Sequence, residues 1–394
     1  MAFTCDDTPF ARTRGDFGHT MGMGLRSFGV EEELLLVDPD GGAPRAMSGA
    51  VLRYAGEHGT GLPGGVAEGG MEHELQREQL EIGTRPCTSL DDLAEQVRRG
   101  RRAAAEAARG AGVQIAALAT SPVAVRPSIT PSSRYRQMAD EYARTADEQL
   151  ICGCHVHVNV DSPEEGVGVL DRIRPWLPPL LALTANSPFW QGRDTGYESW
   201  RQQVWGGWPS SGPTGPFGTP AAYHRTVQEM IATGALLDEG MVYFDARLSR
   251  RYPTVEIRVC DVCLVADDTA LVAALARALV ETAARAWEEG RPPDPVRTEV
   301  VRMAMWRAGR SGLTDDLVHP VTGRPAPAEA VVKDLVDHVR PALEDSGDLD
   351  AVQDLLGRLL RRGNGAALQR AAFARTGLLS EAVTEGVART VDFT

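Results

Sequence analysis

Three consecutive carboxylates lie at the start of an apolar, strand-like segment, SFGVEEELLLVDP. Because side chains alternate along a strand, Glu31 and Glu33 share one face and Glu32 lies on the other. Two carboxylates about 7 Å apart on one face repel each other unless a cation lies near them. The pattern therefore indicates either a site for a hard metal ion or a strand end that is exposed to solvent.

Two histidines alternate within a second strand-like segment, QLICGCHVHVNVDS. His155 and His157 share a face with Asn159, so both imidazoles can reach one pocket. Alternating imidazoles suit a metal site or a phosphate site. The alternative is a pair of structural or exposed histidines.

An acid and a guanidinium group share one face of a third segment, TVEIRVC, as Glu256 and Arg258. Asp245 and Arg247 lie on the preceding segment, MVYFDARLS, which we expect to form a hairpin with it. The carboxylates could hold a metal, and the planar guanidinium groups could bind phosphate or carboxylate oxygens. Taken singly, each pair is explained more simply as a cross-strand salt bridge.

Further acids occur in the segment MEHELQREQLEIGT, as Glu74, Glu78 and Glu81. This segment is too acidic for a buried strand without cations. Glu74 and Glu81 are separated by an odd number of residues, so a regular strand would place them on opposite faces. If both serve one site, a bulge or turn must lie between them.

The cysteines offer a rival site, because Cys152, Cys154, Cys260 and Cys263 could supply the four sulfurs of a zinc centre. Strand alternation argues against it. Cys152 and Cys154 are expected to face away from the histidines, whereas Cys260 is expected to face with the acid and the arginine of its own strand. We interpret these cysteines as small, buried apolar side chains.

The elements that must position these residues form an α+β pattern, with strands before residue 265 and helices after residue 269. A helix is predicted from Ser89, which is a good N-cap residue and is followed by acids in the first turn. Gly and Pro gather at 59–70 and 206–220, which we interpret as long loops near a site. The remaining expected elements are a strand in VQIAALAT, a helix near 133–147, and a helix after Asp161 that its prolines kink or break.

Composition excludes several classes of function. The chain has 394 residues, 41 Lys and Arg against 54 Asp and Glu, and a net charge of −13, which disfavours nucleic acid and anionic membranes as partners. Lys333 is the single lysine, and no phosphate-binding loop of the GxxxxGK[ST] type occurs. With no apolar run of spanning length and few cysteines, we expect a cytoplasmic protein. Acids on several strands, two histidines and many arginines are suited to holding a Mg²⁺-nucleotide.

The chain resembles a known family over most of its length. The segments FGVEEEL, EQLEIGTRP, GCHVHVNV, LTANSPFWQGRDTGYESWR, YFDAR and TVEIRVCD occur in the order and approximate spacing of the YbdK-type carboxylate-amine ligases, the glutamate-cysteine ligase 2 family. This resemblance implies a glutamine-synthetase-like fold, with a curved antiparallel sheet, helices packed on its outer face and a helical C-terminal third. We expect a single catalytic domain over residues 25–394, preceded by a flexible segment at 1–24.

The resemblance also implies a reaction and roles for residues. ATP phosphorylates a carboxylate, usually the γ-carboxylate of glutamate, and an amine attacks the acyl phosphate to give an amide. By analogy one Mg²⁺ or Mn²⁺ ion is held by Glu31, His155 and Glu256, near the transferred phosphate, and another by Glu33, Glu74 and Glu81, near the substrate carboxylate. Arg258, Arg247 and Arg201 are assigned to phosphate or carboxylate oxygens, His157 to phosphate or substrate, and Arg258, Arg247 and Glu256 to catalysis.

Two other interpretations stay open at this point. Acids with histidines also suit a metal-dependent hydrolase or a phosphotransferase without an amine acceptor. The other interpretation is a non-catalytic homologue that binds nucleotide or metal. The amine substrate is not identified by any residue pattern, cysteine being only the default of the family, and a homo-oligomer is left open.

Overall fold

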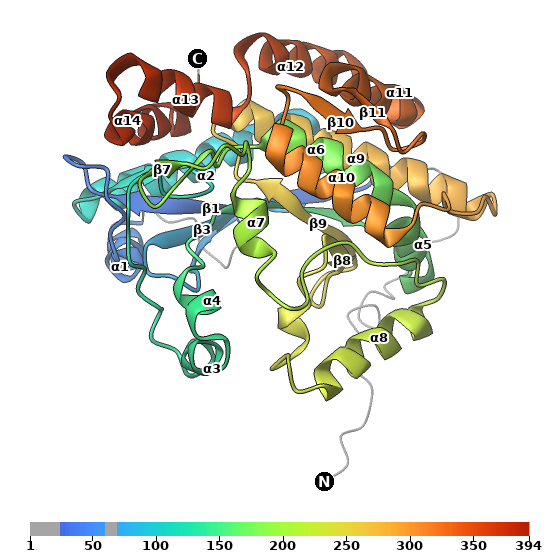
Figure 1. The fold of residues 1–394 in the computed structure, drawn as a ribbon, viewed down its shortest axis with the longest axis horizontal. Helices are drawn as coiled ribbons and strands as arrows, with labels where there is room; N and C mark the ends of the chain where they lie inside the picture. Colours follow the sequence, from blue (N-terminus) through green and yellow to red (C-terminus); the bar gives the residue numbers. More distant parts are fainter. Residues whose placement is uncertain (1–23, 60–68, 394) are drawn as a thin grey trace.

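The computed structural model describes residues 24–59 and 69–393, and its centre is a sheet of seven antiparallel strands (Figure 1). The strand order is β2-β3-β1-β5-β9-β8, and β4 pairs with the end of β1. The strands are β1 (Phe28–Val37), β2 (Met71–His73), β3 (Gln79–Gly83), β4 (Gln114–Ala116), β5 (Gly153–Asn159), β8 (Ala246–Leu248) and β9 (Thr254–Asp261). The expected hairpin of β8 and β9 is confirmed.

The register of these strands brings distant residues side by side. Glu31 pairs with His155 on one neighbouring strand and with Gly83 on the other. Glu33 pairs with Glu81. On the far side of β5, His157 lies opposite Glu256. The antiparallel pairing therefore places the acids and histidines of four strands on one part of the sheet.

Helices cover the face of the sheet opposite these residues (Figure 1). Most residues of the long helix α9 are buried, and it packs against β1, β5 and the neighbouring helices. Helix α2 begins at the expected Ser89 cap, whose side chain accepts a hydrogen bond from the backbone of Asp92. The helices named here and around them are α1 (Ser48–His58), α2 (Leu90–Gly110), α5 (Pro163–Ile173), α6 (Leu177–Thr184) and α9 (Ala266–Glu288).

The side chain of Glu32, the middle one of the three consecutive acids, forms hydrogen bonds with this layer of helices. Its carboxylate accepts two hydrogen bonds from Arg101 of α2, at 2.6 and 2.9 Å, and one from Thr269 of α9. Arg101 is wholly buried and also donates to the carbonyl oxygens of Cys263 and Leu264. A buried charge is tolerated only when it is paired and hydrogen-bonded, so this pair ties β1 to the outer helices.

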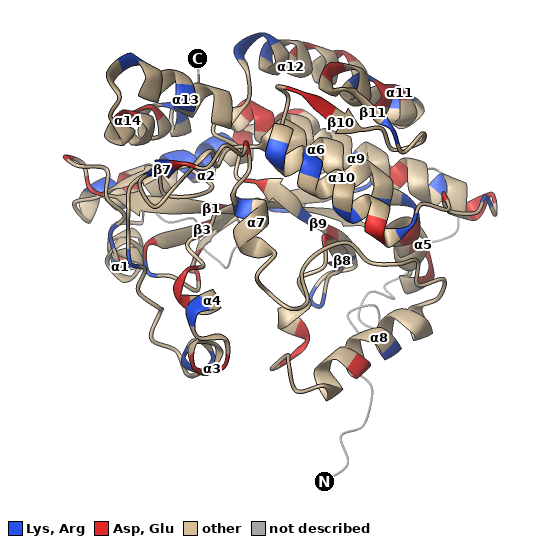
Figure 2. Ribbon diagram, viewed as in Figure 1, with Lys and Arg blue, Asp and Glu red and all other residues tan. Residues whose placement is uncertain are grey.

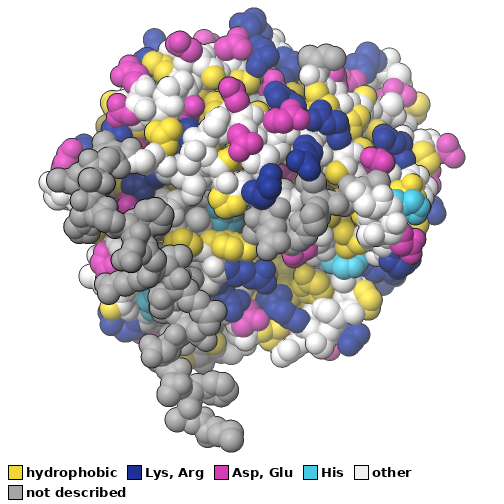
Figure 3. Space-filling view, turned by 180° about the vertical axis from the view of Figure 1, so that it is seen from behind, with side chains coloured by type: hydrophobic (Ala, Val, Ile, Leu, Met, Phe, Trp, Pro, Cys, Tyr) yellow, Lys and Arg dark blue, Asp and Glu magenta, His cyan; other side chains and the backbone are white. Residues whose placement is uncertain are grey.

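The C-terminal third is helical as expected, apart from one small hairpin. Its elements are α10 (Thr298–Ser311), β10 (Asp316–Val318), β11 (Pro325–Pro327), α11 (Ala328–Ser346), α12 (Leu349–Arg362), α13 (Gly365–Thr376) and α14 (Leu379–Thr390). Acidic and basic residues are interspersed along these outer helices (Figure 2), and side chains of both signs occur on the face shown in Figure 3. Within the described ranges, no helix combines the length and apolarity needed to cross a bilayer.

Short helices and loops surround the other face of the sheet. They are α3 (Ser133–Tyr142), α4 (Arg144–Asp147), α7 (Arg201–Trp205), α8 (Pro220–Ala232) and the 3₁₀ turn η4 (Glu239–Met241). The small hairpin of β6 (Phe189–Trp190) and β7 (Arg193–Asp194) lies instead beside α13, where Asp194 forms an ion pair with Arg370. The Gly- and Pro-rich segment 206–219 connects α7 to α8 as a loop, whereas most of the other such segment, 60–68, lies outside the described residues, as do residues 1–23.

Three expected elements are divided more finely than predicted. The helix near 133–147 is interrupted at Ala143, whose φ of 46° ends α3. The proline-containing helix after Asp161 is broken into α5, the 3₁₀ turn η3 (Arg174–Trp176) and α6, because Pro175 cannot donate a backbone hydrogen bond. The segment 71–84 forms two strands, with an irregular stretch between β2 and β3.

Candidate active site

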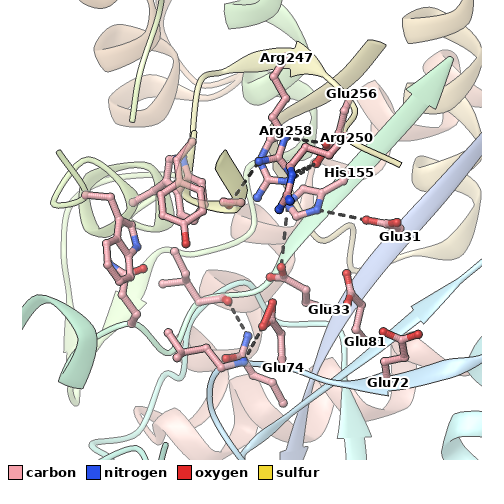
Figure 4. A pocket seen from close by; sticks show the side chains of 18 of the residues that line it. Glu31, Glu33, Glu72, Glu74, Glu81, His155, Arg247, Arg250, Glu256 and Arg258 are labelled. Atoms are coloured by element: carbon pink, nitrogen blue, oxygen red, sulfur yellow. Dashed lines mark hydrogen bonds and ion pairs between the residues drawn. The ribbon is translucent and has the colours of Figure 1, made fainter. Parts of the chain in front are cut away.

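A cavity of about 640 Å³ opens on the uncovered face of the sheet. Its floor is made by β1, β3, β5 and β9, and its walls by α3, α7 and the segment that leads into β8. Acids from the first strands lie on one side of it, and arginines from β8 and β9 lie on the other (Figure 4). The cavity therefore presents a cation-binding half and an anion-binding half to any molecule that enters it.

The carboxylates of Glu31, Glu33, Glu74 and Glu81 point into this cavity (Figure 4). The irregular stretch between β2 and β3 lets Glu74 and Glu81 share it despite their odd separation, which confirms the predicted break. Glu74 accepts a hydrogen bond from the next backbone N–H, at 2.5 Å, and Glu33 accepts one from the backbone of Gly153, at 2.6 Å. Glu78 does not line the cavity.

Crowding of these acids is electrostatically unfavourable without a cation. Burial raises the pKa of Glu74 to about 7, and the charge of Glu33 adds to this effect. Burial and the charges of Glu31 and Glu74 raise the pKa of Glu81 well above its ordinary value. A divalent ion would relieve the repulsion, because it favours the ionised form of each neighbouring carboxylate.

Both histidines of β5 lie beside Glu31. The Nδ1 atom of His155 is 3.7 Å from a carboxylate oxygen of Glu31, and the Nε2 atom of His157 is 3.5 Å from the same oxygen. The two Nε2 atoms are buried and have no hydrogen-bond partner among the described residues. His157 is oriented by a hydrogen bond of 3.0 Å between its Nδ1 atom and Thr254. Unpartnered buried ring nitrogens next to carboxylates suit a bound cation.

The pKa values of Glu31, His155 and His157 are shifted in different directions by burial and by neighbouring charges. Burial opposes ionisation of Glu31, but the charge of His157 and the proximity of both imidazoles lower the pKa of Glu31 below its ordinary value. Burial lowers the pKa of His155, and the charge of Arg258 lowers it further. Burial also acts to lower the pKa of His157, but the charge of Glu31 outweighs it and raises that pKa.

Among the described residues, two groups of three side chains bring one ligand atom each within 4.8 Å of the others. One group is Glu31, Glu81 and His155, and the other is Glu31, His157 and Glu256. Glu31 belongs to both. This grouping differs from the one implied by the resemblance, in which His155 and Glu256 serve one ion and Glu33 and Glu74 help to hold another.

Glu256 is also the centre of an arginine pair. Arg247 donates two hydrogen bonds to its carboxylate, at 2.7 and 3.1 Å, and Arg258 contacts the same carboxylate. These two charges hold the pKa of Glu256 well below its ordinary value even though burial acts to raise it. The Nε atom of Arg258 is buried and has no hydrogen-bond partner within the described ranges. Arg258 therefore keeps a donor for an anionic ligand.

Arg201 is held mainly by the backbone. Its guanidinium nitrogens donate hydrogen bonds of 3.4 Å to the carbonyl oxygens of Arg258 and Val259. The ring of Trp205 contacts both Arg201 and Arg258, whose Cζ atoms lie 5.7 and 5.4 Å from the centre of the ring. Gly153 leaves room for it, because a Cβ atom there would lie 2.3 Å from one of its nitrogens. Arg201 lines the cavity as predicted, but its side chain mostly supports the position of Arg258 and Trp205.

The aromatic wall of the cavity was not identified from the sequence. Tyr135, Trp205, Trp208 and Tyr243 line it, together with Arg134. Of these residues only Trp208 lies in the Gly- and Pro-rich loop after α7, whose composition indicates a loop near a site but not an aromatic wall. Their assignment required the packing of α3 and α7 over the open face of the sheet.

The cysteines take no part in either group of potential metal ligands. Cys87, Cys152, Cys154, Cys260 and Cys263 are buried free thiols. Cys154 and Cys260 lie opposite each other on β5 and β9 within the core, whereas Cys152 lies 3.5 Å from the amide nitrogen of Gln79. These environments support the interpretation of the cysteines as small core side chains.

We expect the double variant Cys152→Ala and Cys263→Ala to lose no more than about 3 kcal/mol of unfolding free energy, because only small buried groups are removed. Its metal content should equal that of the unaltered protein. Denaturant unfolding and elemental analysis of both proteins measure the two quantities. Stoichiometric zinc in the unaltered protein that disappears in the double variant would restore the four-sulfur centre as the correct assignment.

Comparison with known proteins gives one consistent result. The model of the family described as glutamate-cysteine ligase family 2 matches residues 27–392. A Streptomyces avermitilis protein provisionally named glutamate–cysteine ligase 2-1 is 55% identical over 366 residues, which is 93% of this chain and 99% of the relative. A Streptomyces coelicolor protein provisionally named glutamate–cysteine ligase 2 is 54% identical over 366 residues, again 93% of this chain and 99% of the relative.

Solved structures share the fold at low sequence identity. The glutamate–cysteine ligase of Francisella tularensis, in complex with AMP, is 14% identical with a TM-score of 0.67, and the likeness covers 93% of this chain and 88% of that one. A bifunctional glutathione synthetase from Pasteurella multocida has a TM-score of 0.64 at 16% identity, over 93% of this chain and 52% of that one. The expected arrangement of an antiparallel sheet with outer helices is therefore confirmed.

Proposed function

The chain belongs to glutamate-cysteine ligase family 2, and it is therefore an ATP-dependent ligase that forms a C–N bond. We propose that it joins the γ-carboxylate of glutamate to an amine through an acyl phosphate. In the first step an oxygen of the carboxylate attacks the γ-phosphorus of ATP, and ADP leaves. In the second step the amine attacks the acyl carbon, phosphate leaves and one proton is released. Cysteine is the amine that the names of the relatives suggest.

The observation that carries this proposal is the division of one cavity into an acidic half and a basic half. Glu31, Glu33, Glu74 and Glu81 occupy one half, and Arg247 and Arg258 the other. Phosphoryl transfer needs cations to balance the phosphate oxygens and planar donors for the charge that develops on the transferred group. Both requirements are met by side chains that face one another.

The acidic half fits divalent ions. Hard carboxylate oxygens are typical ligands of Mg²⁺ and Mn²⁺. The pKa of Glu74 is raised because this carboxyl group is buried next to another acid, and a bound cation would offset both effects. We propose one ion position at Glu31, Glu81 and His155 and a second at Glu31, His157 and Glu256. Bound there, the ions would neutralise the phosphate oxygens of ATP.

We assign the arginines of the basic half to binding and orienting the transferred phosphoryl group. Arg247 and Arg258 keep Glu256 ionised, so that it can serve as an anionic ligand. Arg258 also has its free Nε donor, and the centre of its guanidinium group lies 5.4 Å from the centre of the Trp205 ring, a contact that limits its movement. We assign Arg258 to the transferred phosphoryl group, with Arg247 as its neighbour on β8 and Arg201 as the support behind it.

A direct assay separates this function from its alternatives. The protein is incubated with ATP, Mg²⁺, glutamate and each member of a panel of amines, and phosphate release and product mass are measured. ADP release that requires both the acid and the amine identifies a ligase. ATP hydrolysis that needs neither substrate would support a hydrolase, phosphorylation without amide formation would support a phosphotransferase, and nucleotide binding without turnover would support a non-catalytic protein.

The two histidines provide a test of the ion positions. His155 and His157 fall in different groups that share Glu31. We therefore expect His155→Ala and His157→Ala each to raise the Mg²⁺ concentration needed for half-maximal ATP turnover by at least about 10- to 100-fold, the loss that follows even when only a partner of a metal ligand is altered. His224→Ala, on the exposed helix α8, is the control. If His157→Ala changed only the KM for ATP, His157 would contact phosphate, as the resemblance first implied.

A further inference from the structure

A second, smaller cavity of about 230 Å³ lies behind α7. It is bounded by α7 with the loop that follows it, by the segment that leads into β8, and by α10 (Figure 1). Arg201, Trp205 and Trp208 line both this cavity and the active-site cavity, so they form the wall between the two. A molecule in the smaller cavity is therefore kept apart from the reacting groups, and the reaction proposed above makes no use of this space.

Asp245 supplies the carboxylate of this smaller cavity. The residue is only 6% exposed, and its Oδ2 atom has no hydrogen-bond partner in the described part of the chain. Its backbone is fixed, since the N–H group of Asp245 donates to the carbonyl oxygen of Gly212 and its own carbonyl oxygen accepts from the N–H group of Arg258. Its sequence position beside Arg247 suggested a metal ligand, but Asp245 belongs to neither group of potential ligands and does not line the larger cavity.

Two guanidinium groups line the same cavity, Arg201 from α7 and Arg302 from α10. Arg201 is 2% exposed, and its Nε atom has no hydrogen-bond partner within the described ranges. Its contacts there are to backbone carbonyl oxygens and to Asp261, and neither arginine is paired with Asp245 among the described residues. Opposite charges thus share one small cavity without touching, an arrangement that is unfavourable unless a bound molecule bridges them.

The carboxyl group of Asp245 stands between two protonation states at neutral pH. Burial raises the pKa of Asp245 to about 7, and the charges of Arg302 and Arg201 only partly oppose this. The ionised group accepts hydrogen bonds, whereas the protonated group also donates one. A molecule that bridges the ionised carboxylate and the arginines must therefore donate a hydrogen bond at one end and accept hydrogen bonds at the other.

A small oxyanion that carries its own hydroxyl group meets both demands. Its charged oxygens accept hydrogen bonds from guanidinium groups, whose planar donors suit phosphate, and its hydroxyl group donates to a carboxylate. The cavity is smaller than the roughly 300–1,000 Å³ typical of sites for drug-sized molecules, so a small ion with a few water molecules fills it. The two arginines disfavour a metal cation there, and the carboxylate disfavours an anion without a hydroxyl group.

We propose that this smaller cavity binds inorganic phosphate, with its charged oxygens at Arg201 and Arg302 and its hydroxyl group at Asp245. The ring of Trp205 contacts the guanidinium groups of both Arg201 and Arg258, so the wall connects the site to the active-site cavity. Phosphate is released by the ligase reaction, and the site therefore senses a product, a role that rests on the proposed function. Binding itself does not depend on that role.

Calorimetric titration of the full chain with phosphate and with sulfate, at constant ionic strength and without ATP and Mg²⁺, measures binding apart from turnover. At pH 8 Asp245 is mostly ionised, and phosphate still carries a proton whereas sulfate carries none. We expect sulfate to bind at least about 10-fold more weakly than phosphate, because a hydrogen bond to a charged group is replaced by repulsion. Absence of phosphate binding, or equal binding of the two anions at pH 8, overturns the proposal.

Variants assign the binding to this cavity. Arg302 does not line the larger cavity, so Arg302→Gln should weaken phosphate binding about 10-fold only if phosphate lies in the smaller one. In Asp245→Asn the amide can donate to either anion, and sulfate should bind about as tightly as phosphate. Arg307→Gln, on the same helix and outside the cavity, is the control. Phosphate binding that is equal in Arg302→Gln and the unaltered protein would belong to other arginines and would refute the site. Arg302 is exposed, so its variant is expected to fold even if Asp245→Asn does not.

The pH dependence provides an independent readout. The charged groups that face Asp245 are Arg201 of α7 and Arg302 of α10, and neither loses its charge between pH 6 and 8. As the pH falls over this range Asp245 becomes protonated and can donate to sulfate, so the preference for phosphate over sulfate should decrease by about tenfold. The preference should change much less in Asp245→Asn. An equally steep change in that variant would show that Asp245 does not contact the anion.

Steady-state kinetics test the role as a product sensor. A ligand that engages Arg201 loosens its contacts with the strand that carries Arg258, so phosphate should lower ATP turnover in a way that added ATP or glutamate does not reverse. Arg302→Gln should lose this component of the inhibition, and inhibition equal in both proteins would refute the role. Phosphate binding that depends on Arg302 in a protein without ligase activity would refute the proposed function alone. Ligase activity with equal phosphate binding in all variants would refute this site alone.

Discussion

Glu31→Gln is expected to lower ATP turnover by roughly two to three orders of magnitude while the protein stays folded. Glu31 is the one side chain common to both proposed ion positions, so its loss weakens both at once. Metal ions contribute several kcal/mol of charge stabilisation in the transition state, and each 1.36 kcal/mol corresponds to about tenfold in rate. Phosphate release against Mg²⁺ concentration, with circular dichroism as the test of folding, measures the effect.

The neighbouring residue provides the matched control. Glu32→Gln makes the same chemical change one position away, on the opposite face of β1, where it removes the charged partner of buried Arg101. We expect it to lower the unfolding free energy by about 3–5 kcal/mol and to leave the Mg²⁺ dependence of the folded protein unchanged. Near-normal turnover in Glu31→Gln, or an equal shift of the Mg²⁺ dependence in both variants, would remove Glu31 from the metal site.

Arg258→Lys is expected to lower turnover by about 100-fold, close to the effect of removing one preorganised donor from a transition state. Lysine keeps the positive charge but loses the planar fork, the free Nε donor and the contact of the guanidinium group with the ring of Trp205. Burst-phase or single-turnover measurement of ADP formation, with ATP and glutamate present, tests the phosphoryl-transfer step directly.

Arg102→Lys is the control for this change, because Arg102 lies on the outer helix α2 in an exposed ion pair with Glu95. It should be silent in the same assay. If Arg258→Lys were equally silent, charge alone would suffice at this position. The assignment of Arg258 to the phosphoryl group would then be wrong, although the ligase function could stand.

The alternation of side chains along single strands was sufficient to predict which residues of β1 and β5 face the cavity. Alternation along β1 separates Glu31 and Glu33 from Glu32, and the structure places the first two in the cavity and the third against Arg101. The same rule correctly places His155 and His157 in one cavity. These predictions depend only on the two-residue period of a strand, which is a property of neighbouring residues.

The irregular segment shows where this reasoning ends. The odd separation of Glu74 and Glu81 predicts a break between β2 and β3, and the break is present. Its form, which turns Glu78 out of the cavity to accept a hydrogen bond from the backbone of Ser128, depends on contacts with a segment 50 residues away. No rule of local alternation contains that information.

The sequence by itself therefore determined the helical C-terminal third, the strands with their two faces, and the residue types that make phosphate and metal chemistry possible. Tertiary structure alone decided which side chains meet. The register of β1 with β3 and β5, and of β5 with β9, places His157 with Glu256 and His155 with Glu81, while the partner of Glu32 is Arg101, 69 residues away. The physical reason is that register and helix packing follow from burial summed over the whole core, whereas alternation follows from the backbone of each strand.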